Sequence, residues 1–113
     1  MSKAVLIVYT NPVSPERDAE YNKWYDETHL PEVLGVDGFV AASRYRVSPA
    51  QANGVEAPPH RYVSVYEADT EDPQGLLDAM LRGAKDMHIS DSCDLQNASA
   101  VLWEEITPRV TRA

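Results

Sequence analysis

Two amphipathic segments alternate with four short segments rich in β-branched and aromatic residues, and this order limits the fold more than any other sequence feature. The amphipathic segments repeat their apolar residues every three to four positions, as helices do, whereas the short segments alternate or are apolar throughout, as strands do. The predicted strands span residues 4–10, 38–47, 60–68 and 98–106. The predicted helices follow Ser14-Pro15 and Asp72-Pro73, because a capping side chain before proline is typical of a helix start.

The resulting order is β-α-β-β-α-β, which is the split βαβ, or ferredoxin-like, pattern. It predicts an α+β fold in which a four-stranded antiparallel sheet carries two helices on one face. The length of 113 residues fits a single domain over residues 1–113. Residues 48–59 are rich in Pro, Ala, Asn and Gly and predict a flexible loop, and residues 108–113 are expected to form a frayed tail.

The sheet face away from the helices needs a cover of its own. Small and aromatic residues are frequent in the predicted strands, and charge is too scarce there for a fully hydrated surface. Alternation in residues 38–47 places Phe39 and Tyr45 on one face and Arg44 on the other. We therefore expect a homodimer in which the two sheets pack face to face.

Acidic residues outnumber basic ones by 18 to 10, which gives a net charge of −8. Such a chain is repelled by phosphate backbones and anionic lipids, so neither nucleic acid nor a membrane is an expected partner. No apolar run approaches the roughly 20 residues that span a bilayer. Cys93 is the only cysteine, which is typical of a reducing compartment and predicts a cytoplasmic protein.

No cofactor and no metal is expected. The five glycines are scattered, so there is no Gly-rich loop to hold a phosphate. The His and Cys residues show neither an HxxxH nor a CxxC spacing, which a metal site would favour. Any chemistry would then depend on side chains alone.

The first predicted helix carries the side chains of greatest chemical interest. Tyr21, Trp24 and Tyr25 fall on one helical face, and His29 follows Tyr25 by one turn. Asp26 precedes His29 by three residues, a spacing at which a carboxylate can orient the imidazole and fix its tautomer. His29 is therefore the candidate general base or acid, with Asp26 and Tyr25 as its catalytic neighbours.

We expect the main helix to end near His29, because Pro31 disfavours a helical conformation at the residue before it, and residues 32–34 to form one further turn closed by Gly35. The carbonyl end of the helix and nearby carboxylates would then raise the pKa of His29. An alternative interpretation is that His29 only caps the helix and that the aromatic side chains fill the core.

Further candidates for binding a substrate lie elsewhere in the chain. Tyr62 and Tyr66 share one face of the strand predicted over residues 60–68. His88 ends the second helix and is a candidate to line the same cavity as His29. With Tyr21 and Trp24, they form the predicted substrate-binding set.

The pattern E-Y-x-x-W-Y-x-x-x-H-x-P, followed by G-F and then R-Y, resembles the EthD-like family of the dimeric α+β barrel superfamily. The residues that carry the match are Glu20, Tyr21, Trp24, Tyr25, His29, Pro31, Gly38, Phe39, Arg44 and Tyr45. The resemblance implies ferredoxin-like subunits that pair sheet to sheet, each with a cavity between sheet and helices. It implies that His29 is the polar residue of that cavity, with Tyr25 and Trp24 beside it.

Three functions are consistent with these features. The first is a metal-free acid/base enzyme of cyclase, dehydratase or isomerase type that acts on a small aromatic or polyketide-like compound. In that enzyme Tyr25 or Tyr66 would donate a hydrogen bond to a developing enolate. The others are a monooxygenase that is cofactor-free or has a flavin partner, and a non-catalytic ligand-binding or accessory dimer of a catabolic pathway. The superfamily contains several chemistries, so the fold alone does not choose among them.

Overall fold

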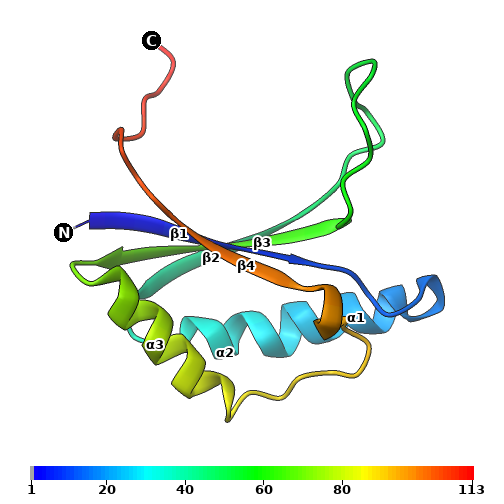
Figure 1. The fold of residues 1–113 in the computed structure, drawn as a ribbon, viewed down its shortest axis with the longest axis horizontal. Coiled ribbons are helices and arrows are strands. Elements are labelled where there is room, and N and C mark those ends of the chain that lie inside the picture. Colours follow the sequence, from blue (N-terminus) through cyan, green and yellow to red (C-terminus); the bar gives the residue numbers. More distant parts are fainter. Residues whose placement is uncertain (1) are drawn as a thin grey trace.

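The computed structural model describes residues 2–113 and has one four-stranded antiparallel sheet with its helices on a single face (Figure 1). The strands are β1 (Ser2–Thr10), β2 (Phe39–Arg46), β3 (Tyr62–Thr70) and β4 (Ser99–Glu104), in the spatial order β2-β3-β1-β4. The helices are α1 (Asp18–Trp24), α2 (Leu30–Leu34) and α3 (Pro73–Ala84). The predicted ferredoxin-like α+β fold is confirmed, with β1 and β3 at the centre of the sheet.

The apolar core lies between the sheet and the helices. Leu6 of β1 and Tyr66 of β3 are opposite each other in the strand register, and both side chains are fully buried. Val33 of α2 and Leu76 of α3 pack against them from the helical layer. Burying side chains of this size stabilises the fold by roughly 1.5–3 kcal/mol each, so this cluster holds the two layers together.

The first helical rod continues without a break past His29, so the prediction that the main helix ends there is wrong. The further turn expected over residues 32–34 is present as part of α2, and Gly35 follows it. A π-helical turn, Tyr25–His29, joins α1 directly to α2, and the N–H of Leu30 donates to the carbonyl of Tyr25, five residues back. Pro31 is therefore accommodated inside the rod. A wider turn of this kind relieves the contact between a proline ring and the preceding turn that would break a regular α-helix.

Strand β2 begins with a bulge, which corrects one predicted face. The register shifts between Phe39 and Ala41, so that Phe39 is opposite Ala68 and is buried toward the helices. Phe39 therefore shares a face with Ala42 and Arg44, not with Tyr45. The extra residue, Val40, is exposed, as is usual for the unpaired residue of a bulge.

The opposite sheet face, here called the outer face, carries no helix (Figure 1). The loop between β2 and β3 and the segment after β4 both extend on this side, away from the helices. The outer face presents apolar side chains from the strands, among them Val5, Ile7, Val63, Val65 and Trp103. Separately, none of the helices in residues 2–113 is long and apolar enough to cross a membrane.

A pair of glycine substitutions tests how closely the layers pack. Gly38, just before β2, has φ +106°, and a Cβ there would lie 2.7 Å from Cδ1 of Leu76. Gly54 has φ +84° in the β2–β3 loop, and a Cβ added there would have nothing within 4 Å. We expect Gly54→Ala to cost about 1 kcal/mol of unfolding free energy for its backbone strain, and Gly38→Ala about 1–3 kcal/mol more for the added clash. Urea denaturation measures both, and equal losses would contradict this packing.

Candidate functional site

The side chain of Tyr25 lies at the centre of a buried aromatic group between the first helical rod and the sheet. The centre of its ring lies 5.6 Å from the ring centre of Tyr21, 5.2 Å from that of Trp24 and 5.1 Å from that of His29, all in edge-on arrangements. The guanidinium of Arg44 lies 4.3 Å from the ring centre of Tyr25. Edge-to-face aromatic pairs and a cation over a ring face are both favourable, which explains why a charged side chain is tolerated here.

Strand β2 delivers Arg44 to this group, because the alternation of β2 turns it toward the helices. Its side chain is only 12% exposed, and its terminal nitrogens donate to Oδ1 of Asn22 at 2.9 Å and to Oδ1 of Asp26 at 2.8 Å. Asp26 therefore pairs with Arg44. The prediction that Asp26 orients the imidazole of His29 is wrong. A π turn displaces residues that would face each other in a regular α-helix, so the spacing of three residues was misleading.

Two tyrosine hydroxyls in this group are buried without a well-formed hydrogen bond. The hydroxyls of Tyr25 and Tyr66 lie near each other and near Ser64, yet neither reaches hydrogen-bond geometry with a partner. Burial raises the pKa of both tyrosines, so both remain neutral donors at pH 7. Tyr21 differs, since its hydroxyl is hydrogen-bonded to Thr10, although burial still raises its pKa to about 12.

His29 lies beside this group and is mostly buried, with 16% of its side chain exposed. Its ring stacks on Trp24 at 4.9 Å, and its buried Nδ1 has no hydrogen-bond partner. Glu32 Oε1 lies 3.9 Å from Nδ1, too far for a hydrogen bond but close enough to stabilise a protonated ring. Burial lowers the pKa of His29, and the charge of Glu32 opposes this only in part.

The predicted rise in the pKa of His29 is therefore wrong. That prediction placed the ring at the carbonyl end of a helix and beside several carboxylates, both of which favour the cation. Because the rod continues to Leu34, those carbonyl groups are used within the helix and the ring is packed against Trp24 instead. Desolvation then decides the sign, and the imidazole is neutral at pH 7.

Glu32 connects His29 to His88. The Glu32 carboxylate accepts hydrogen bonds from the backbone N–H of His88, at 2.9 and 3.1 Å, and lies 2.8 Å from its Nδ1. Burial alone would raise the pKa of Glu32, but these contacts with His88 hold it below its usual value. The carbonyl of His88 also accepts from Trp24 Nε1 at 2.6 Å. The side chain of His88 is 85% exposed, so its place is at the surface beside Glu32 and not inside a shared cavity.

The buried group reaches the surface at the edge of β2. An open cavity of about 500 Å³ is lined there by Asn22, Asp26, Arg44, Tyr45, Arg46 and Tyr62. The hydroxyl of Tyr62 donates to Asp18 at 2.5 Å, and Tyr62 packs against Tyr21. At this cavity the charged side chain of Arg44 lies between the solvent and the buried ring of Tyr25.

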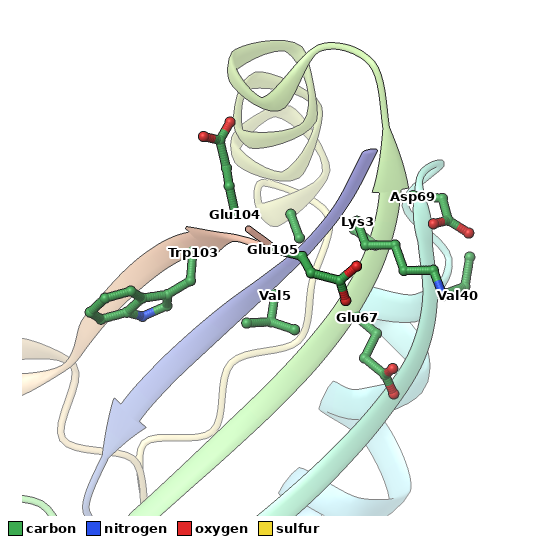
Figure 2. Close-up of a pocket in the computed structure, with 10 residues that line it drawn as sticks. Lys3, Val5, Val40, Glu67, Asp69, Trp103, Glu104 and Glu105 are labelled. Carbon is green, nitrogen blue, oxygen red and sulfur yellow. The ribbon is translucent and has the colours of Figure 1, made fainter. Parts of the chain in front are cut away.

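A second hollow, of about 330 Å³, lies on the outer face (Figure 2). Figure 2 shows Val5 and Trp103 beside it, with Lys3 and Glu67 among the charged side chains around it. None of the predicted site residues lines this hollow. It is therefore a feature of the outer face and lies apart from the aromatic group.

The structure thus brings most of the predicted site residues together. Those that share the buried group are Tyr21, Trp24, Tyr25, His29, Tyr62 and Tyr66. Arg44 was not predicted to belong to the site. The sequence feature that could have identified Arg44 is its alternation with Ala42, because the two residues share a strand face and that face points to the core. No group of three or more His, Cys, Asp or Glu side chains within residues 2–113 is arranged to hold a metal ion.

Comparison with solved structures identifies the class of fold. The chain superposes on an ethyl tert-butyl ether D (EthD) family protein from Bacillus halodurans with a TM-score of 0.60 and 17% identity, over 94% of this chain and 100% of that one. A monooxygenase candidate from Shewanella loihica gives 0.54 and 15%, over 100% and 99%. HapK from Hahella chejuensis gives 0.51 and 16%, over 100% and 99%. The predicted resemblance to EthD-like proteins is confirmed at the level of the ferredoxin-like fold.

No family model matches the sequence, and no curated protein matches it significantly. At identities of 13–17%, the solved structures establish the architecture of the chain and leave its chemistry open.

The titration of His29 tests the electrostatics of the site. We expect its ring proton, followed by NMR, to titrate with a midpoint below 6.5, because burial disfavours the cation. Glu32→Gln should lower the midpoint further, since it removes the one charge that favours protonation. Glu27→Gln, an exposed change on the same rod, should leave it unchanged. A midpoint at or above 6.5 would contradict a dominant effect of burial on this ring.

Proposed function

We propose that the chain is a metal-free acid/base enzyme that moves protons on a small aromatic or polyketide-like compound with an acidic C–H bond. One observation carries the proposal. Four buried polar atoms in residues 2–113 lack a hydrogen-bond partner, and all belong to Tyr25 or to side chains around it: Tyr25 Oη, Tyr66 Oη, His29 Nδ1 and Arg44 Nε. More than nine in ten buried polar groups are normally paired, so such a cluster is typical of a site completed by a ligand.

The chemistry of the cluster suits an enolate intermediate. His29 is neutral at pH 7 and would accept a proton from the carbon next to a carbonyl group. The electron pair of that C–H bond would move to the carbonyl oxygen, and the hydroxyl of Tyr25 or Tyr66 would donate to the resulting enolate. Glu32 would stabilise the imidazolium. Return of the proton to another carbon gives isomerisation, and its loss with a β-hydroxyl group as water gives dehydration.

Proton exchange tests this chemistry without knowledge of the natural substrate. In D₂O, we expect the protein to accelerate deuterium incorporation next to the carbonyl of 2-tetralone, followed by NMR. His29→Gln should reduce this acceleration by about 10²–10⁴-fold while the far-UV spectrum and the melting temperature are kept. His60→Gln is the matched control, because His60 contacts Tyr9 and Asn97 away from the site.

Other outcomes of the same experiment would contradict the proposal. Oxygen consumption in place of exchange would indicate a monooxygenase, the assignment carried by the Shewanella loihica protein. Saturable quenching of Trp24 fluorescence, in a Trp103→Phe background and with neither reaction, would indicate a binding or accessory protein.

We also propose that two copies pair through their outer faces to form a homodimer. The helices lie on the other side of the sheet, so the outer face has no helical cover (Figure 1). The strand register places apolar side chains on that face. Val101 and Trp103 are exposed on it, as is Tyr45 at its other edge. A twofold pairing of this face with itself would bury these side chains without leaving a free apolar patch.

The dimer is tested by a charge at the centre of the outer face. We expect wild-type protein to sediment with twice the monomer mass and Ile7→Glu to sediment as a monomer, because a buried unpaired carboxylate is costly. Leu81→Glu places the same charge on an exposed position of α3 and should stay dimeric. Dissociation by Leu81→Glu instead would place the interface on the helical side.

A cytoplasmic location remains our proposal, supported by the state of Cys93. Its thiol is unpaired and buried against the aromatic group, and burial raises its pKa to about 11. A protonated, buried thiol is inert, so Cys93 is a packing residue and not a nucleophile.

A further inference from the structure

Two arginines line the open cavity at the edge of β2. Arg44 and Arg46 are two residues apart in the strand and are opposite Ser64 and Tyr62, so both belong to the strand face that points toward the helical layer. Both contribute to the lining of the same cavity of about 500 Å³. Although the chain has a net charge of −8, two positive charges therefore lie at this cavity, which is called the entrance below.

The positive charge of this cavity is only partly neutralised. Asp26 is the one carboxylate in the lining, and its side chain is 60% exposed where it pairs with Arg44. Asp18 lies nearby, but its Oδ1 already accepts from Tyr62 and is 4.0 Å from Arg61. Within residues 2–113, the side chain of Arg46 forms no hydrogen bond or ion pair. The entrance therefore keeps a net positive charge.

Donor groups are also left over at this entrance. Nε of Arg44 is buried and has no acceptor, while its two terminal nitrogens are bound by Asn22 and Asp26. Asp26 itself is 60% exposed, so water screens its ion pair with Arg44, and the carboxylate of a ligand can replace it without leaving the buried guanidinium unpaired. A guanidinium released in this way presents a planar pair of donors that matches a carboxylate.

The walls of the cavity define the rest of the ligand. Tyr45 and Tyr62 line it with aromatic surface, and the ring of Tyr25 lies directly beneath Arg44. Planar rings next to paired guanidinium groups favour a flat ligand that carries an anionic group. We infer that the cavity binds an aromatic carboxylate, with Arg44 and Arg46 holding the carboxylate and Asp26 occupying its place in the free protein. This ligand class deepens the proposed function and rests on it for the chemistry that follows binding.

Calorimetry with a matched pair of probes tests the inference. We expect 2-naphthoate to bind at least tenfold more tightly than the isosteric neutral amide, 2-naphthamide, and its affinity to fall as KCl is raised. Arg46→Gln should weaken naphthoate binding about three- to fivefold, the range of an exposed ion pair. Arg82→Gln, an exposed change of the same charge on α3, should not alter it.

The sharpest variant is Asp26→Asn. If Asp26 competes with the ligand for Arg44, its removal should tighten naphthoate binding about threefold and leave naphthamide binding unchanged. Asp37→Asn changes the net charge equally. Asp37 precedes the first residue of β2, whereas Arg46 is the last, so this change should not affect binding. Equal binding of the acid and the amide, or equal effects of Asp26→Asn and Asp37→Asn, would overturn the inference.

The two proposals fail separately. Naphthoate binding that depends on Arg46 and Asp26 supports the ligand class even if His29→Gln leaves proton exchange unchanged, which would remove only the acid/base function. Loss of exchange in His29→Gln with no preference for naphthoate over naphthamide would overturn the carboxylate inference and leave the acid/base function in place.

Discussion

The contact between the Arg44 guanidinium and the ring of Tyr25 is the interaction on which the site depends. An isolated charge in a protein interior is strongly unfavourable, and here it is balanced by an aromatic face on one side and by Asn22 and Asp26 on the other. The strand and the helical rod must approach closely for all three contacts to form. The position of the rod on the sheet is therefore fixed by a polar interaction as well as by apolar packing.

This arrangement divides the space between sheet and helices into two parts with different roles. At one part, the cluster around Leu6, Val33 and Leu76 is apolar and fully packed. At the other, the aromatic group keeps several buried polar atoms unpaired, and each costs about 1–3 kcal/mol of stability. A domain of this size has only about 5–15 kcal/mol of net stability, so the apolar part must compensate for the reactive part.

The element order, the antiparallel sheet and the aromatic stripe could be predicted, because they follow from residue spacing and from proline and capping positions. The environment of His29 could not, since it depends on a π turn that absorbs Pro31 and keeps the ring out of solvent. The side on which Phe39 lies depends on a bulge, which shifts the alternation by one residue. Arg44 was correctly predicted to lie on the face opposite to Tyr45, but its contact with Tyr25 requires knowing which helix covers that face.

The wide turn also sets the rotational phase of the first helical rod. In a regular α-helix, the eight residues from Tyr25 to Val33 advance by about 800°, which would turn Val33 about 80° away from the direction of Tyr25. A π turn takes up about one extra residue, or roughly 100° of rotation, and so returns Val33 to nearly the same direction. Both side chains are indeed buried against the sheet. One continuous rod can thus place a tyrosine in the reactive half and a valine in the apolar half, and deletion of a single residue within Tyr25–His29 would turn one of these two side chains outward.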